Sequence, residues 1–307
     1  MEYKWMPIIG GFEEENGNLI FRGATTVLQN QEVDRLGLFV CNQIFNGGTI
    51  TAEIEFKERT SNRSSCDIVI FYDPQNQSTV NVGLGDESLF TIRYFADSKW
   101  TLQAIAGGQG NLRANRPYAL RVERYGSMIR QSVDGVEVLR TILPFPLGQS
   151  QVGVQCLDKS DIIVRNFNVE NIRPKAFVVM QFSEPYNDVY YDVIKKVCHE
   201  LEIEVARIDE ASGPGIIISD ITREINESHL IIADITPRNP NVFYEVGYAH
   251  ALSKPTILIA EKGTDLPFDV SPFRTLFYEN SIGGKGRLEE GLRKHVQAIF
   301  SERGVAS

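Results

Sequence analysis

The spacing of apolar residues changes once along this 307-residue chain, close to Ile172-Arg173-Pro174. Before that point apolar and polar residues alternate with a period of two, as in residues 49–56, where Ile50, Ile54 and Phe56 share one face. After it, short apolar runs alternate with segments of helical spacing. A packed domain needs one consistent pattern, so the change predicts two domains of different class, as the chain length also favours.

The first pattern predicts an antiparallel β-sandwich over residues 1–172. Turn residues recur every 8–15 positions, and Asp134-Gly135 between Val133 and Val136 is a strong hairpin signal. The strand rhythm and this hairpin are similar to jelly-roll sandwiches of the concanavalin-like or laminin-G-like kind. That resemblance implies a recognition or oligomerisation domain with a protein or carbohydrate ligand.

The second pattern predicts a flavodoxin-like α/β domain over residues 175–307 with a parallel sheet. Strands are expected at 176–180, 203–208, 229–234, 255–259 and 276–278. Helices are expected over the spacing Val189, Ile194, Val197 and Leu201, and at 215–227, 239–252 and 288–303. Continuous apolar strands between helices are typical of a sheet covered on both faces.

Composition excludes several classes of protein. With 40 acidic against 31 basic residues the net charge is −9, so we expect no nucleic-acid partner. No apolar run approaches a membrane span and the N-terminus does not read as a secretory signal, so we expect no membrane partner and a cytoplasmic location. The cysteines and histidines show no metal-ligand spacing, so we expect no metal site and buried free thiols.

Ligands of parallel sheets bind beyond the carboxyl ends of the strands, which selects a small set of residues. Gln181 and Phe182 follow the first predicted strand, Asp209 follows the second, and Asp234 and Thr236 end the third. We therefore treat these five residues as candidate substrate-binding positions.

The helix predicted over residues 239–252 carries a further candidate, Glu245. Asn239 followed by Pro240 is a typical helix start, and Glu245 then lies one turn after Asn241. Small residues let this helix pack close to the sheet, where partial burial would raise the pKa of a carboxyl group. The alternative is a surface glutamate that only stabilises the helix.

A resemblance to a known family adds to this interpretation. The run Leu230-Ile231-Ile232-Ala233-Asp234-Ile235-Thr236, followed by Asn241-Val242-Phe243-Tyr244-Glu245-Val246-Gly247-Tyr248-Ala249, resembles the signature of nucleoside 2-deoxyribosyltransferase-like proteins. Their fold is close to that of bacterial TIR domains, and the similarity covers about residues 175–300.

The resemblance implies cleavage of an N-glycosidic bond, with Glu245 at the anomeric carbon and Asp220 completing the site. It further implies that Asp234 or Asn241 holds ribose hydroxyls, while Phe182 and Tyr244 stack on the base. The loop after the first strand has no glycine-rich phosphate motif, and Arg207 or Arg238 could pair with a pyrophosphate or be surface charges.

The functional hypothesis from sequence is an N-glycosidase that hydrolyses NAD or another nucleotide, with the nucleotide as substrate and no separate cofactor. A regulated antiviral defence effector of bacteria is the expected context, and the sandwich would sense a partner or form a homo-oligomer. The alternative is a catalytically silent nucleotide-binding sensor on the same scaffold.

Overall fold

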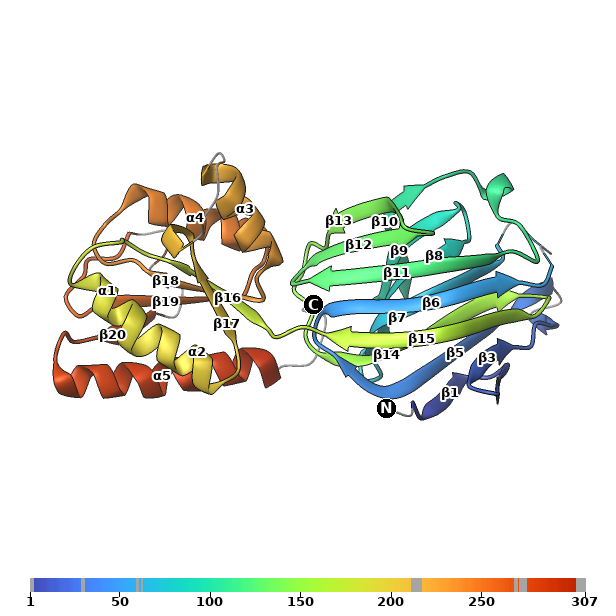
Figure 1. The fold of residues 1–307 in the computed structure, drawn as a ribbon, viewed down its shortest axis with the longest axis horizontal. Helices are drawn as coiled ribbons and strands as arrows, with labels where there is room; N and C mark the ends of the chain where they lie inside the picture. Colours follow the sequence, from blue (N-terminus) through green and yellow to red (C-terminus); the bar gives the residue numbers. More distant parts are fainter. Residues whose placement is uncertain are drawn as a thin grey trace.

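The computed structural model describes residues 3–28, 31–58, 61, 63–210, 217–267, 270 and 275–301. Its first half is an antiparallel β-sandwich, and its second half is a parallel sheet with helices on both faces (Figure 1). The change of apolar period therefore marks the change of architecture that the sequence predicts.

The sandwich consists of two antiparallel sheets. The first has the order β1-β5-β14-β7-β8-β9-β10, with β4 paired to β5. Its strands are β1 (Trp5–Ile9), β4 (Thr25–Leu28), β5 (Gln31–Phe45), β7 (Ser65–Asp73), β8 (Ser78–Gly85), β9 (Phe90–Ala96), β10 (Lys99–Ala106) and β14 (Ser150–Asp158). A 3-10 turn, η1 (Gln109–Asn111), follows β10.

The second sheet has the order β13-β12-β11-β6-β15-β3-β2. Its strands are β2 (Phe12–Glu15), β3 (Asn18–Phe21), β6 (Gly48–Phe56), β11 (Pro117–Tyr125), β12 (Met128–Val133), β13 (Val136–Ile142) and β15 (Ile162–Asn171). The hairpin predicted at Asp134-Gly135 is confirmed, since it joins β12 to β13 with both residues at positive φ (50° and 80°).

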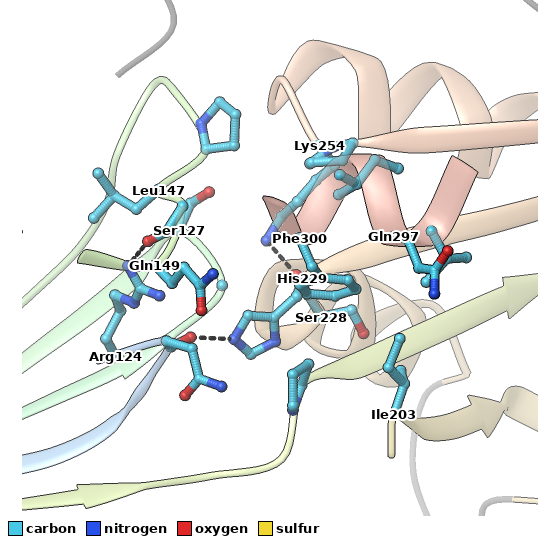
Figure 2. A pocket seen from close by; sticks show the side chains of 18 of the residues that line it. Arg124, Ser127, Leu147, Gln149, Ile203, Ser228, His229, Lys254, Gln297 and Phe300 are labelled. Carbon is cyan, nitrogen blue, oxygen red and sulfur yellow. Dashed lines mark hydrogen bonds between the residues drawn. The ribbon is translucent and has the colours of Figure 1, made fainter. Parts of the chain in front are cut away.

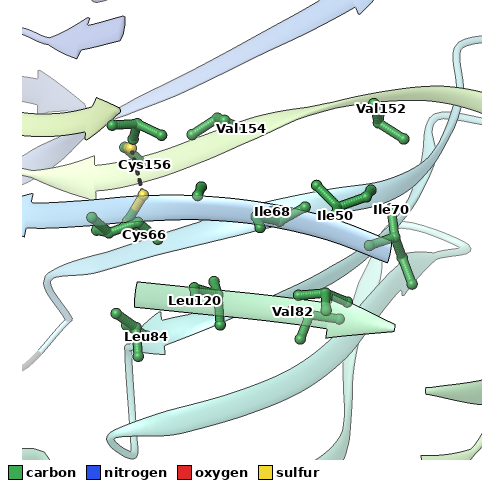
Figure 3. Close-up of a cluster of buried hydrophobic side chains, with 14 of the residues drawn as sticks. Ile50, Cys66, Ile68, Ile70, Val82, Leu84, Leu120, Val152, Val154 and Cys156 are labelled. Atoms are coloured by element: carbon green, nitrogen blue, oxygen red, sulfur yellow. Dashed lines mark hydrogen bonds between the residues drawn. The ribbon is translucent and has the colours of Figure 1, made fainter. Parts of the chain in front are cut away.

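Alternate side chains of the two sheets meet in one apolar core. Ile50 from β6 and Ile68 from β7 lie in it fully buried, as Figure 3 shows. Cys66 and Cys156 face each other there with their sulfurs 3.4 Å apart, and both are free thiols. The expectation of buried free cysteines is confirmed.

The parallel sheet of the second half has the order β17-β16-β18-β19-β20. Its strands are β16 (Lys175–Val179), β17 (Glu204–Arg207), β18 (Leu230–Asp234), β19 (Thr256–Glu261) and β20 (Thr275–Tyr278). Ala176 and Val178 pack on one face of the sheet, while Phe177 and Val179 pack on the other. Burial on both faces explains why this strand is a continuous apolar run.

Two groups of helices cover these faces (Figure 1). One face carries α1 (Tyr186–Val189), η2 (Tyr190–Ile194), α2 (Lys195–Glu200) and α5 (Ile282–Ser301), and the other carries α3 (Ile217–Glu227) and α4 (Pro240–Ala251). A 3-10 turn, η3 (Ile208–Glu210), follows β17.

The last helix differs from its prediction. The sequence predicts a start at residue 288, but α5 starts at Ile282 and its first turns contain three glycines, Gly283, Gly284 and Gly286. A Cβ at Gly284 would lie 2.1 Å from the Glu279 carbonyl oxygen, so the close approach after β20 requires glycine there. Helix propensity is overridden by packing at this position.

Among the described residues, no helix is long and apolar enough to cross a membrane. The cytoplasmic location predicted from the sequence stays a prediction.

Candidate functional site

A cleft of about 630 Å³ opens between α3 and α4 beyond the carboxyl ends of β16 and β17. This is the edge of the sheet where the sequence predicts a ligand. We call it the α3–α4 cleft, and its lining residues are Met180, Gln181, Phe182, Ile208, Ile218, Ile221, Thr222, Ile225, Asn239, Asn241, Val242, Tyr244, Glu245 and Tyr248.

The α4 helix presents one of its faces to the cleft. Its start is fixed by Asn239, whose side-chain oxygen accepts a hydrogen bond from the Asn241 N–H at 3.0 Å, with Pro240 next in the chain. Val246 and Ala249 are buried against the sheet, whereas the other small residues of the helix, Gly247 and Ala251, are exposed, so of the small residues Ala249 alone packs there. The helix is thereby held with its 241, 244, 245 and 248 side chains along the cleft.

Glu245 is the titratable group of this cleft with the most unusual environment. Partial burial raises the pKa of its carboxyl group to about 7. Within the described part of the chain, no hydrogen bond or ion pair joins this carboxyl group to another residue. Glu245 therefore exchanges a proton near neutral pH and has hydrogen-bonding capacity left for a ligand.

The other lining groups are amides, hydroxyls, aromatic rings and aliphatic side chains. Tyr244 is 62% exposed, so its ring is open to a ligand, whereas the 45% exposed Phe182 ring has the Arg207 guanidinium over one face, 5.2 Å from its centre. No lysine or arginine is among the described lining residues, and Glu245 is their one carboxyl group. Two-carboxylate glycoside hydrolysis needs a second acid, which this lining does not contain.

The structure brings together five of the residues that the sequence selects: Gln181, Phe182, Asn241, Tyr244 and Glu245. Gln181 is oriented by a hydrogen bond from its amide nitrogen to the Ser183 hydroxyl at 2.9 Å.

The remaining four selected residues lie outside the lining. Asp220 is on α3 but forms an ion pair with Arg223 at 3.0 Å. Asp209 pairs with Arg207 through two hydrogen bonds of 2.6 and 2.7 Å. Thr236 accepts a hydrogen bond from the Glu261 N–H at 2.8 Å.

Asp234, the fourth, is fully buried at the end of β18. It accepts hydrogen bonds from the Tyr278 hydroxyl and the Thr236 N–H, both at 2.9 Å. Burial raises its pKa to about 7, against the opposing effect of these hydrogen bonds. The hydrogen bond from Tyr278 connects β18 to β20, so Asp234 has a structural role.

Neither arginine considered for a pyrophosphate is available in the cleft. Arg207 is buried, with its guanidinium 4.0 Å from the Tyr190 ring centre and its charge balanced by Asp209. Arg238 pairs with Asp265 at 2.8 Å.

Sequence reasoning missed the α3 side of the cleft, which includes Thr222 and the three isoleucines at 218, 221 and 225. It also left out Tyr248, whose hydroxyl accepts a hydrogen bond from Asn226 at 3.3 Å. The helical spacing from Glu245 could have indicated Tyr248. The α3 residues have no local signal, since only the packing of α3 beside α4 places them.

Comparisons with known proteins concern about half of the chain. No protein-family model matches it, and no curated protein sequence matches it. Among solved structures, a carbohydrate-binding module from Bacillus subtilis has 13% identity and a TM-score of 0.45, covering 53% of this chain and 92% of that one. A protein of galectin-like fold from Bacillus subtilis has 11% identity and a TM-score of 0.36, with 53% and 96% covered. A β-glucanase from Bacillus licheniformis has 10% identity and a TM-score of 0.38, with 52% and 87% covered.

The predicted N-glycosidase acting on NAD or another nucleotide is contradicted. The similar structures carry the names of glycoside hydrolases, carbohydrate-binding and galectin-like proteins, and none of those named here is a nucleoside deoxyribosyltransferase, a TIR domain or a defence effector. The residues that line the α3–α4 cleft give a physical reason for the same correction. The cleft offers no described lysine or arginine to a phosphate, and Asp220 does not reach it.

Proposed function

We propose that the α3–α4 cleft binds an uncharged ligand that carries hydroxyl groups and an apolar or aromatic face, such as an aryl glycoside. In this proposal protonated Glu245 donates a hydrogen bond to a ligand oxygen. The observation that carries the proposal is a half-buried carboxyl group, without a described partner, whose pKa lies at about 7.

The lining chemistry supports this ligand class. Gln181, Asn241 and Thr222 supply hydrogen-bond donors and acceptors. Tyr244 supplies an exposed ring, and Phe182 supplies the ring face that the Arg207 guanidinium does not cover. Ligand sites commonly combine an apolar lining with a few polar groups in a volume of roughly 300–1,000 Å³. An anion would meet the Glu245 carboxylate without a compensating lysine or arginine, which disfavours phosphates.

The test is a titration with a panel of phenyl glycosides at pH 6 and pH 8, followed by ligand-observed NMR. We expect the wild-type protein to bind about tenfold more tightly at pH 6, because deprotonation removes the donor. Glu245→Gln keeps an N–H donor without a titrating group, so its affinity should be the same at both pH values. Asp220→Asn, on α3 outside the cleft, is the matched control and should behave as wild type.

Affinity that is equal at the two pH values in the wild-type protein contradicts the donor role of Glu245. The donor role of Glu245 is also contradicted if Glu245→Gln shows the same pH dependence as the wild-type protein.

We also propose the finer classifications that the sequence predicts. When the five strands of the parallel sheet are numbered in chain order, their order in the sheet is 2-1-3-4-5, which supports a flavodoxin-like domain.

The homo-oligomer and the protein or carbohydrate ligand of the sandwich remain predictions. Multi-angle light scattering of the full chain tests the first, and an oligosaccharide array tests the second.

A further inference from the structure

A second cavity, of about 690 Å³, lies at the junction between the sandwich and the α/β half (Figure 2). We call it the junction cavity. The sandwich contributes Arg124 and residues 146–149 to its walls, and the other half contributes His229, Lys254 and the last turns of α5. Both halves of the chain are therefore needed to form it.

Arg124, at the end of β11, brings a permanent positive charge to this cavity. Its side chain is 1% exposed. One guanidinium nitrogen donates to the Gly148 carbonyl oxygen at 3.1 Å, while Nε has no hydrogen-bond partner among the described residues. The Phe45 ring, whose centre is 5.3 Å from the guanidinium, offers a cation–π contact but no counter-charge. Burying an arginine without a counter-charge is costly.

Lys254, from the turn between α4 and β19, is a second buried cation on the same cavity and is 4% exposed. Its Nζ donates to the Asn226 and Ser228 carbonyl oxygens at 2.7 and 2.9 Å, which uses two of the three N–H donors of an ammonium group. Burial and the nearby Arg124 charge lower its pKa to about 7, against the opposing effect of the Glu227 carboxylate. An anion beside Lys254 would restore its charge.

His229 contributes hydrogen bonds rather than charge. Its Nδ1 accepts from the Lys175 N–H at 3.2 Å, and its Nε2 lies 2.9 Å from the Asn46 carbonyl oxygen. These two partners together select the neutral ring with the proton on Nε2. Burial, with the Arg124 charge, lowers the His229 pKa to about 3, in agreement with that form.

The described wall of this cavity holds no counter-charge to these groups, and the carboxylate that acts on Lys254, Glu227, lies outside the lining. No aspartate or glutamate is among its described lining residues. The part of the lining that α5 contributes is mostly apolar, with Val296, Ile299 and Phe300 beside Gln297. A ligand that fits this lining has a charged oxyanion at one end and an apolar body at the other.

We propose that the junction cavity binds a small organic oxyanion, a carboxylate or a phosphate monoester, which contacts Arg124 of the sandwich and Lys254 of the α/β half. Its apolar part lies against α5. The site shares no lining residue with the α3–α4 cleft, and it takes an anion where the cleft takes an uncharged ligand.

The test compares benzoate and phenyl phosphate with benzamide, which has the same ring and no charge. Ligand-observed NMR titrations of the full chain at pH 7 and constant ionic strength measure each affinity. We expect both anions to bind at least tenfold more tightly than benzamide.

Variants from the two halves locate the binding. Lys254→Met and Arg124→Gln should each weaken the binding of both anions by tenfold or more, because a charge-assisted hydrogen bond is lost. Lys294→Met, an exposed position on α5, is the matched control and should bind as wild type. Thermal unfolding of each variant shows whether it is folded before its affinity is compared.

A crystal structure of the wild-type protein with 4-bromobenzoate does not depend on any variant folding. The anomalous signal of bromine is expected in the junction cavity, on the α5 side. Bromine found elsewhere overturns the proposal, as does equal affinity for the three probes or unchanged anion affinity in both folded variants.

Discussion

Two carboxyl groups of the α/β half share a pKa raised to about 7, and their partners distinguish their tasks. Asp234 is fully buried and accepts two hydrogen bonds, from Tyr278 and Thr236. Glu245 is partly buried beside an open cleft and has no partner among the described residues. A satisfied buried acid holds strands together, whereas an unsatisfied acid in a cleft is available to a ligand.

The burial of Glu245 predicts a pH-dependent gain in stability for Glu245→Gln. The folded-state pKa of about 7 lies above the unfolded value of about 4.3, so the wild-type protein loses stability as the pH rises through this interval. At pH 8 the uncharged glutamine avoids the cost of burying the carboxylate, and the variant should melt at the higher temperature. At pH 5, close to the unfolded value, most of this cost is absent, so the difference in melting temperature should be much smaller.

Differential scanning calorimetry at both pH values measures this effect. Asp220→Asn should show no gain, because Asp220 is paired with Arg223. An equal difference between Glu245→Gln and wild type at pH 5 and pH 8 argues against burial as the cause.

At the scale of elements, local signals set the helix that carries the cleft. Asn239 caps α4 and Pro240 occupies its first turn, so interactions local in the sequence fix where the helix starts. The register set by that start directs Val246 to the sheet and Glu245 to the cleft. The turn at Asp134-Gly135 fixes the register of β12 and β13 in the same way.

We predict that Asn239→Ala lowers the free energy of unfolding by about 1 kcal/mol, because the Asn241 N–H loses its cap. Asn239→Ser keeps an oxygen acceptor and should retain most of the stability. Urea unfolding of the two variants measures the difference. If both variants unfold at the same urea concentration, the cap does not stabilise α4.

At the scale of the whole molecule, close contacts hold the two halves together. His229 reaches the Asn46 carbonyl oxygen across the junction at 2.9 Å. Gly126 has φ +57°, and a Cβ there would lie 2.5 Å from the Ser228 carbonyl oxygen. We propose the predicted division into units 1–172 and 175–307, and expression of residues 1–172 alone tests whether the sandwich folds independently.

The junction should weaken in mild acid through His229. Its folded-state pKa of about 3 lies below the unfolded value of about 6.5, so its contribution is complete above pH 6.5 and is lost as the pH falls toward 3. Protonated Nδ1 can no longer accept from the Lys175 N–H. Between pH 7 and pH 4.5 the wild-type melting temperature should therefore fall further than that of His229→Gln, which does not titrate.

Thermal melts across this pH interval make the comparison, with His199→Gln, an exposed histidine on α2 that is not among the residues lining the cavity, as the control. A wild-type protein and a His229→Gln variant with parallel pH profiles would exclude His229 as the acid-sensitive group.

The sequence by itself determined the class of each half and one side of the cleft. The apolar period, the Asp134-Gly135 turn and the Asn239 cap act within a few residues, so they can be recognised without tertiary structure. Gln181 and Phe182 were predicted because ligands bind beyond the carboxyl ends of parallel strands. Glu245 and Asn241 were predicted from their spacing on the helix. The nucleotide chemistry inferred from the family resemblance was wrong.

Tertiary structure decided which polar groups are satisfied and which face a cavity. Asp234 looks like a site residue in the sequence, but its partner Tyr278, 44 positions away in the sequence, is identified only when the chain is folded. Arg124 and Lys254 are 130 positions apart, and no local pattern connects them. The free energy of a buried charge depends on what packs against it, and packing across the junction is a property of the folded chain alone.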